Sequence, residues 1–371
     1  MANKFITAIS LLIGTTIGAG FLGMPYVFAK AGFLIGAVHL VIITTIVLLI
    51  NLYIGEISLR TKGNHQLTGY AQHYLGRKGR KIMLFLMIFS IYSALLAYII
   101  GEGNSLSFLV FGATSSYFIS GIVFWLTLSL LNYSGIRALR KYEPLSVALV
   151  IFLALFIITL FLPRIELQNL SSLNTQYLFL PFGIILFSML GYTVMPEMEI
   201  VLKGKEKYMK NAIILGTLIP AFIYLLFAIS VSGTFGTATP EIATLALGKI
   251  FVLLGIVTMF TAYLALSISL ENVYMLDYHI SNKKSWLLTT IVPVSLFTLL
   301  EFLNKNSFIK ILGISGTISG GIAGILILFM IFQAKRKGNR KPEYEIPINK
   351  TLISIVSLIF ILGILLEIFM H

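Results

Sequence analysis

Long apolar stretches separated by short polar loops make up most of this sequence. Eleven of them hold about 17–25 predominantly apolar residues, the length that a helix needs to cross the hydrocarbon core of a bilayer. This pattern predicts an all-α polytopic membrane protein with eleven transmembrane helices, at residues 5–29, 33–58, 82–106, 116–133, 144–163, 177–202, 211–233, 249–275, 286–303, 308–332 and 351–369.

The composition supports a membrane protein. Of 371 residues, 58% are hydrophobic and only 11% are charged, and the mean hydropathy is +0.96. A soluble protein of this size cannot bury so many apolar side chains, so part of its solvent must be lipid. The first stretch is long, lacks a cleavage site and is followed at once by further spans, unlike a signal peptide. We expect a multi-pass protein of the cell membrane.

The 27 Lys and Arg residues are distributed unevenly over alternate loops. With the N-terminus in the cytoplasm, 22 of them lie on the cytoplasmic side, and the outside receives only Lys30, Arg164, Lys249, Lys305 and Lys310. Because cytoplasmic loops are enriched in Lys and Arg, this predicts a cytoplasmic N-terminus and a C-terminus outside. Topology thus explains the net charge of +13 without a nucleic-acid partner.

Two predicted spans contain sequence that disfavours a continuous helix. The first includes GTTIGAGFLGMPYVF, residues 14–28, with four glycines and a proline. Gly20 is followed five residues later by Pro25, and in the sixth span Gly191 is followed five residues later by Pro196. Spans 1 and 6 cross the membrane in opposite directions, so paired interruptions indicate a transporter site built from inverted repeats.

Close helix packing is the other interpretation of such glycines. Gly14 and Gly18 form a small-xxx-small pattern, which brings membrane helices together. The two interpretations are compatible in span 1. In the tenth span packing is the preferred interpretation, because Gly316, Gly320 and Gly324 recur every four residues on one helical face.

The sequence around both interruptions resembles a known transporter family. IGTTIGAGFLGMPYVFAKAGF, residues 13–33, resembles the first span of the amino acid/auxin permease branch of the amino acid–polyamine–organocation superfamily. Residues 186–236, which contain LFSMLGYTVMPEMEI, resemble the sixth and seventh spans of the same family, with a Pro-Glu pair, a basic loop and a closing Gly-x-Phe-Gly. Bacterial aromatic amino acid permeases and other neutral amino acid transporters share this pattern.

The resemblance implies a LeuT-type fold in a single transmembrane domain, residues 1–371. A first five-helix repeat would cover residues 1–163, and an inverted second repeat would cover residues 176–333. The last span, residues 351–369, would lie outside both repeats. Spans 1 and 6 would be broken in mid-membrane.

A free amino acid is a zwitterion, and each of its charges needs a fixed partner once it leaves water. Amides released at the start of a half-helix can bind the carboxylate, and carbonyls released at the end of a half-helix can bind the ammonium. We expect the carboxylate near the backbone of Thr16, Gly18, Ala19 and Gly20. The carbonyls expected to bind the ammonium are those of Phe187, Ser188 and Leu190.

Other residues are expected to shape the pocket around the substrate. Gly191 and Tyr192 follow the second interruption, and Tyr92, Tyr98 and Tyr263 are candidate liners from spans 3 and 8. No charged residue is placed at mid-depth against the substrate side chain. A neutral, hydrophobic or aromatic L-amino acid is therefore the expected substrate.

The coupling ion is left open between a proton and sodium. In the resembling families a Thr-Ser pair on span 8 binds sodium, and Thr261–Ala262 supplies only one of the two hydroxyls. Span 5 has no ionisable residue whose charge could take the place of a bound sodium ion. An incomplete oxygen cage favours a proton, while a sodium site near Thr261 built mainly from backbone carbonyls stays possible.

Carboxylates inside the membrane are natural proton carriers. The candidates are Glu197, which matches the family's Pro-Glu pair, Glu271, which has no basic residue near it in sequence, and Glu102 on span 3. The alternative for each is an acid at a helix end that is solvated or paired locally. Glu56, four residues before Arg60, fits that alternative.

These features predict a cation-coupled symporter that imports its amino acid by alternating access, with no cofactor and no obligate protein partner. The sequence has no HExxH, Gly-x-Ser-x-Gly or P-loop motif, so an enzyme is not expected. An amino acid sensor or exchanger of the same fold remains open. An ion channel would need a continuous polar path, which the apolar span interiors do not offer.

Overall fold

The computed structural model describes residues 2–63, 65–133 and 143–370. Arg137, Arg140 and Lys141, which count among the predicted cytoplasmic basic residues, lie outside this part. The regular elements within it are all helical: α1 (Ala2–Thr16), α2 (Gly20–Ala31), α3 (Phe33–Arg60), α4 (Leu67–Phe111), α5 (Tyr117–Tyr133), α6 (Glu143–Phe161), α7 (Leu167–Ser171), α8 (Leu180–Met189), α9 (Met195–Val201), α10 (Met209–Phe235), α11 (Thr244–Leu247), α12 (Lys249–Asp277), α13 (Asn282–Phe302), α14 (Phe308–Ser315), α15 (Gly321–Lys337) and α16 (Lys350–Met370), with short 3-10 and π segments between some of them.

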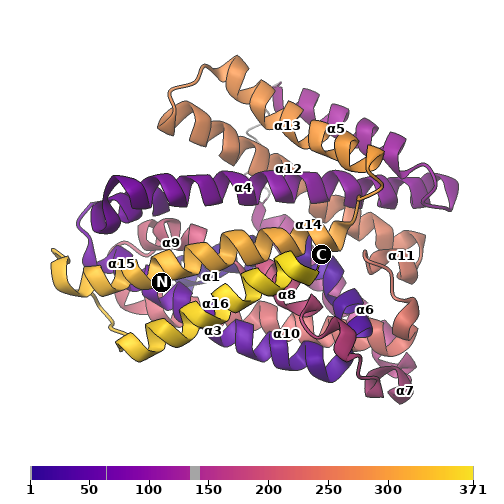
Figure 1. Cartoon of the computed structure of the whole chain (residues 1–371), viewed down its shortest axis with the longest axis horizontal. Helices are drawn as coiled ribbons and strands as arrows, with labels where there is room; N and C mark the ends of the chain where they lie inside the picture. Colours follow the sequence, from indigo (N-terminus) through magenta and orange to yellow (C-terminus); the bar gives the residue numbers. More distant parts are fainter. Residues whose placement is uncertain (1, 64, 134–142, 371) are drawn as a thin grey trace.

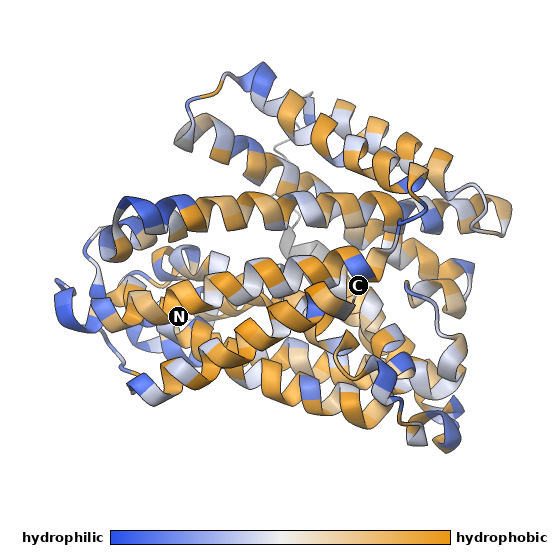
Figure 2. Ribbon diagram, in the orientation of Figure 1, coloured by the Kyte–Doolittle hydropathy of each residue, from blue (hydrophilic) through white to orange (hydrophobic). Residues whose placement is uncertain are grey.

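Most of these helices are suited to a bilayer. Within the described residues, eight helical segments are long and apolar enough to cross a membrane, and the bent pair α1–α2 makes a ninth. Two shorter apolar helices, Tyr117–Tyr133 and Ala148–Arg164, occupy the positions of the fourth and fifth predicted spans. Figure 2 shows hydrophobic residues along the middle of the long helices and hydrophilic residues gathered near their ends. The protein is a multi-pass helical membrane protein, and the number of eleven spans stays a prediction.

Helix α4 lies between two groups of helices (Figure 1). On one side it packs against α5, α12 and α13, and on the other against α14 and α15. In the second group α10 packs against α1, α2 and α3, while α8 packs against α2, α3 and α14. The two interrupted spans therefore lie next to each other inside the larger group.

The glycine ladder of the tenth span packs as the sequence predicts. A Cβ atom on Gly316 would lie 2.2 Å from the carbonyl oxygen of Gly183 on α8, and one on Gly324 would lie 2.5 Å from the ring of Phe360 on α16. The stretch Gly316–Gly320 between α14 and α15 forms a π segment, η7. Small residues here let α8 and α16 approach this span closely.

A buried carboxylate fixes the loop between α15 and α16 to the end of α3. Glu56, fully buried on α3, accepts hydrogen bonds from Arg60 Nε at 2.8 Å, Lys335 Nζ at 2.8 Å and Ile346 N at 2.7 Å. The hydroxyl of Tyr344 in the same loop donates to the carbonyl oxygen of Leu52 at 2.7 Å. The local pair with Arg60 is confirmed, and Glu56 also joins three segments that are distant in sequence.

Candidate functional site

The first predicted interruption is confirmed. Helix α1 ends at Thr16, α2 begins at Gly20, and the two axes are bent by 56°. In the link, Gly18 N donates to the carbonyl oxygen of Thr16 at 3.0 Å, and Phe21 N donates to that of Gly18 at 3.2 Å. The amides of Ala19 and Gly20 make no such backbone bond within the described chain. They are the groups that a half-helix start offers to an anion.

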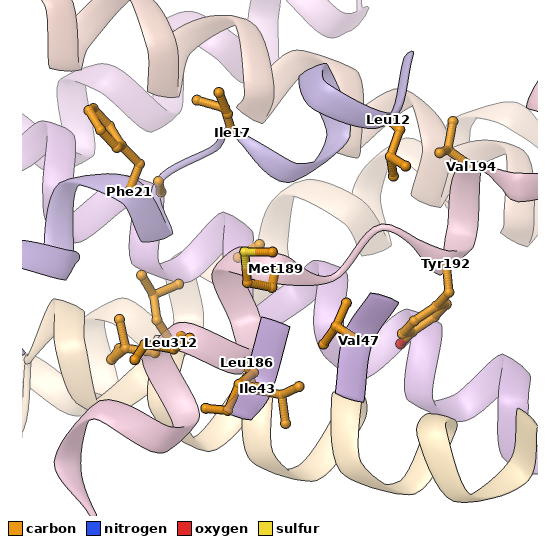
Figure 3. Packing of buried hydrophobic residues seen from close by; sticks show 14 of the residues in the cluster. Leu12, Ile17, Phe21, Ile43, Val47, Leu186, Met189, Tyr192, Val194 and Leu312 are labelled. Atoms are coloured by element: carbon orange, nitrogen blue, oxygen red, sulfur yellow. The ribbon is translucent and has the colours of Figure 1, made fainter. Parts of the chain in front are cut away.

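The second predicted interruption lies between α8 and α9. Helix α8 ends at Met189, two non-helical residues follow, and one 3-10 turn, η4 (Tyr192–Val194), leads into α9. Figure 3 shows Met189 and Tyr192 on the two sides of this link, and Ile17 and Phe21 on the two sides of the first link. Both spans are therefore interrupted within the buried apolar core.

The two interruptions touch each other through Gly20 and Ser188. A Cβ atom on Gly20 would lie 2.1 Å from Ser188 Oγ, so nothing larger than glycine fits at this position. Ser188 is buried, and its hydroxyl donates to the carbonyl oxygen of Ile184 at 2.7 Å. The predicted carboxylate-binding segment thus lies beside the predicted ammonium-binding end of α8.

The other two residues predicted to offer carbonyls face another neighbour. The Phe187 side chain lies 2.7 Å from a Cβ atom built on Gly316, and the Leu190 side chain lies 2.9 Å from one built on Gly320. The carbonyl of Phe187 accepts the amide of Leu190 at 3.3 Å. Of the three residues, the structure places Ser188 at the first interruption.

Tyr224 on α10 joins the same two interruptions and is absent from the predicted site. Its hydroxyl lies 2.7 Å from the carbonyl oxygen of Thr16 and 3.2 Å from that of Ser188, and its side chain is fully buried. A hydroxyl carries one proton, so the two carbonyls share a single donor. Their remaining acceptor capacity suits a cationic donor such as an ammonium. Nothing local in the sequence distinguishes Tyr224, because aromatic residues make up 13% of the chain.

Asn51 and Thr217 add polar groups beside the second interruption. Asn51 Nδ2 donates to Thr217 Oγ1 at 3.2 Å, and Asn51 Oδ1 has no hydrogen-bond partner among the described residues. A Cβ atom on Gly191 would lie 3.5 Å from Asn51 Nδ2 and 3.3 Å from Thr16 Oγ1. A sequence signal existed here, since an Asn inside an apolar span is a sign of function in a membrane protein.

Of the three tyrosines predicted to line the pocket from spans 3 and 8, Tyr98 lies at the first interruption. Its hydroxyl lies beside the backbone of Ala19. The same oxygen would lie 3.6 Å from a Cβ atom on Gly18. Tyr98 is therefore placed to contact a ligand held by the released backbone. Tyr192 is also buried, directly after the second interruption.

Tyr92 and Tyr263 have other partners. The Tyr92 hydroxyl lies 2.6 Å from that of Tyr274 and donates to the carbonyl oxygen of Leu288 at 3.0 Å, between α4, α12 and α13. The ring of Tyr263 packs edge-on against Phe124 of α5, with centroids 5.3 Å apart. Among the described residues, neither side chain forms a hydrogen bond or ring contact with Tyr98.

The residues considered for ion coupling lie apart from one another. Thr261 Oγ1 donates to carbonyl oxygens one turn earlier in its own helix α12, at 3.1 Å each. Glu271 accepts a hydrogen bond from Asn132 Nδ2 on α5 at 2.7 Å. Glu197 lies exposed in the first turn of α9. Their roles in coupling stay predictions.

Glu102 has a different environment from these three. It is fully buried, and neither carboxyl oxygen has a hydrogen-bond partner among the described residues. It precedes the end of α4 at Phe111 by nine residues, or about 13 Å along the axis. It also lies one turn beyond Tyr98 on the same helix.

The paired interruptions offer amides, carbonyls and hydroxyls in an apolar setting, which suits a ligand that carries both charges itself. Within residues 2–63, 65–133 and 143–370, no three His, Cys, Asp or Glu side chains are grouped to hold a metal. A separate cavity of about 410 Å³ lies between α2, α8, α14 and α16 and contains none of the residues predicted to bind substrate.

Comparison with known sequences shows which class of protein this chain is similar to. The profile of the tryptophan/tyrosine permease family matches residues 1–369. Tyrosine-specific transport system 1 of Haemophilus influenzae is 25% identical over 396 residues, which cover 98% of this chain and 96% of the relative. Glutamine transporter 2 of Aliivibrio fischeri is 25% identical over 358 residues, 91% of each chain. Tyrosine-specific transport system 2 of H. influenzae is 28% identical over 244 residues, 63% of this chain and 59% of the relative. The comparisons point to amino acid transport and not to an enzyme.

Proposed function

Because the chain belongs to the tryptophan/tyrosine permease family, we propose that it is a cation-coupled symporter that imports a neutral L-amino acid by alternating access. The observation that carries the proposal is the contact between the two interrupted spans, where Gly20 meets Ser188 and Tyr224 reaches both links. Two interrupted helices in corresponding positions are the usual substrate site of such transporters.

The substrate carboxylate binds the amides of Ala19 and Gly20 at the start of α2. These amides make no backbone bond within the described chain, and the positive end of the helix dipole points towards them. The ammonium binds the carbonyls of Thr16 and Ser188, in competition with the Tyr224 hydroxyl. The two charges of the substrate are thus neutralised by backbone dipoles, without a charged side chain of the protein.

The substrate side chain is hydrophobic or aromatic and packs beside Tyr98 and Tyr192. Both tyrosines are buried. The names of the relatives, which refer to tyrosine and to glutamine, agree with a neutral side chain. Glutamine is the polar alternative, and Asn51 and Thr217 are the groups that would hydrogen-bond its amide.

The fold we propose is of the LeuT type, in the amino acid–polyamine–organocation superfamily. It has eleven spans, inverted repeats at residues 1–163 and 176–333, a cytoplasmic N-terminus and a C-terminus outside. The bend of 56° between α1 and α2 and the gap between α8 and α9 support this fold. The distribution of basic residues supports the orientation.

A proton is our preferred coupling ion. The hydroxyl of Thr261 bonds to its own helix, and its neighbour Ala262 has none, so a hard-cation cage is incomplete there. The acids that remain candidates for coupling are Glu197, Glu271 and Glu102.

Purified protein in liposomes tests the proposal. Labelled tyrosine, tryptophan, phenylalanine and glutamine are offered separately, with inward proton or sodium gradients imposed one at a time. Saturable uptake driven by one gradient is the expected result. Exchange without net accumulation would identify an exchanger, and binding without transport would identify a sensor. Ion flux that does not saturate would identify a channel. Each of these results contradicts the proposed symporter.

A further inference from the structure

Glu102 is the described carboxyl group most fully enclosed by the helices near the first interruption. The residue before it, Gly101, faces Met259 on α12 and Phe308 on α14, and the residue after it, Gly103, faces Tyr117 on α5. Three helices thus close around this turn of α4. The Glu102 side chain is 0% exposed.

Among the residues that the structure describes, no hydrogen-bonding group is paired with the carboxyl group of Glu102. The ionisable side chains at the outer ends of the segments packed around this turn include Tyr98, Tyr117, Glu241, Lys249, Tyr263, Glu301, Lys305 and Lys310. None of them forms a hydrogen bond or ion pair with either carboxyl oxygen within the described residues. Tyr117 is engaged with Glu301. Helix α15 brings its basic residues only at its far end, around Lys335.

A carboxylate without a partner in such surroundings costs several kcal/mol, so the neutral acid is the form that fits this arrangement. The charged form requires water, which enters only if the helices around Gly101 and Gly103 separate. Phe308, 1% exposed, lies between Gly23 on α2 and Gly101 on α4. Movement of α14 that displaces Phe308 would expose the start of α2 and the turn of Glu102 together.

We propose that Glu102 carries the coupling proton of this transporter. The carboxylate takes up one proton from the outer side while Phe308 is displaced, and it is neutral when the helices close. It releases that proton to the inner side after substrate has left, so one proton crosses per cycle and no other bond changes. This proposal rests on the proposed symport function and names the group that couples it.

Glu102→Gln keeps the shape and a neutral side chain but cannot carry a proton. Three readings are taken in liposomes and detergent: exchange of labelled for unlabelled tyrosine, accumulation driven by an inward proton gradient, and tyrosine affinity. We expect exchange and affinity within about twofold of wild type and at least a tenfold loss of accumulation. Glu367→Gln is the matched control, because Glu367 is also buried, on α16 beside Thr317 and Gly313; it should keep all three activities.

Accumulation by Glu102→Gln equal to wild type overturns the proposal, and so does a loss of tyrosine affinity, which would make Glu102 a substrate ligand. Failure of the wild type to exchange any offered amino acid contradicts the proposed function instead.

An infrared spectrum tests Glu102 independently of transport. The wild type should show a protonated-carboxyl band at neutral pH that Glu102→Gln lacks, and the absence of this band from the wild type contradicts the proposal. Glu102→Leu, which suits the apolar surroundings, serves if Glu102→Gln is not monodisperse.

Discussion

The hydroxyl of Tyr224 donates to the carbonyl oxygen of Thr16 at 2.7 Å, at the residue where α1 ends. The same carbonyl accepts the amide of Gly18 at 3.0 Å, so Tyr224 supplies a second donor to a carbonyl that is released from the helix where there is no water. Tyr224 therefore stabilises the interruption itself. The same hydroxyl is within reach of Ser188, so one side chain supports both broken spans.

Tyr224→Phe should lower the free energy of unfolding by about 1–3 kcal/mol, since the buried carbonyls of Thr16 and Ser188 lose the one hydroxyl proton that they share. If the substrate ammonium binds the same carbonyls, added tyrosine restores part of the loss. The rise in Tm on adding tyrosine should then be larger in the variant than in the wild type. Thermal unfolding in detergent measures both, with Tyr278→Phe at a 49% exposed tyrosine as control. Equal Tm shifts would rule out a shared binding role.

Gly20→Ala should abolish most transport, because its Cβ atom would lie 2.1 Å from Ser188 Oγ and force the two links apart. We expect at least a tenfold fall in uptake. Combining it with Ser188→Gly removes the clashing atoms and should recover part of the activity, as expected for residues in contact. Uptake by the double variant, compared with each single variant, checks this. Full activity of Gly20→Ala alone would show that the links do not need their close contact.

Tyr98→Phe should raise the KM for tyrosine about tenfold with little change in the maximal rate, since its hydroxyl lies at the link between α1 and α2, 3.6 Å from a Cβ atom built on Gly18, where it can contact the substrate. Tyr92→Phe and Tyr263→Phe should leave KM within about twofold, because these rings have partners elsewhere. Initial rates of uptake across a range of substrate concentrations separate the three. An effect of Tyr92→Phe as large as that of Tyr98→Phe would contradict the placement of the pocket.

Thr261→Ala should transport at the wild-type rate, and replacing sodium by potassium should change neither protein. The reason is that Thr261 supplies one hydroxyl and its neighbour Ala262 supplies none, so the oxygen cage that sodium needs is incomplete. Uptake measured with and without sodium at constant pH checks this. Sodium stimulation that is lost in Thr261→Ala would identify a sodium site and remove the preference for a proton.

Glu56→Gln should lower the free energy of unfolding by about 2–4 kcal/mol, because a buried carboxylate loses charge-assisted bonds to Arg60 and Lys335. The loop 338–349 should also become more sensitive to protease. Glu345→Gln is the control: Glu345 pairs with Arg60 too, but it is 59% exposed, and surface pairs contribute about 0–1 kcal/mol. Similar Tm values for the two variants would contradict a special role for Glu56.

The interruptions of spans 1 and 6 could be predicted from sequence because Gly and Pro act on their own backbone. The contact of Gly20 with Ser188 also agrees with the predicted pairing of the two segments. The three tyrosines predicted to line the pocket from spans 3 and 8 do not all lie at the first interruption, and the reason is geometric. Tyr92 and Tyr98 are six residues apart, about 240° around a helix, so they cannot both face one interruption.

Tyr224 and Glu102 depend on information that lies outside their local sequence. Hydropathy gives the depth of a residue along its span, but not the direction that its side chain faces. The partner of Tyr224 is Thr16, which lies more than a hundred residues away in sequence. The surroundings of Glu102 include Met259, which packs against the neighbouring Gly101 and is also more than a hundred residues away. Asn51 is the exception, because an amide within an apolar span stands out without a structure.

The bonds of Glu56 also have a mechanical consequence. They join the end of α3, the end of α15 and the loop that leads to α16, so these three helices are held as one rigid frame at that end. The half-helix α1 is held differently: Lys4 Nζ donates to the carbonyl oxygen of Lys203, just after α9. In the alternating-access cycle that we propose, α1 and α9 would move together, and α3, α15 and α16 would be the part of the protein against which they move.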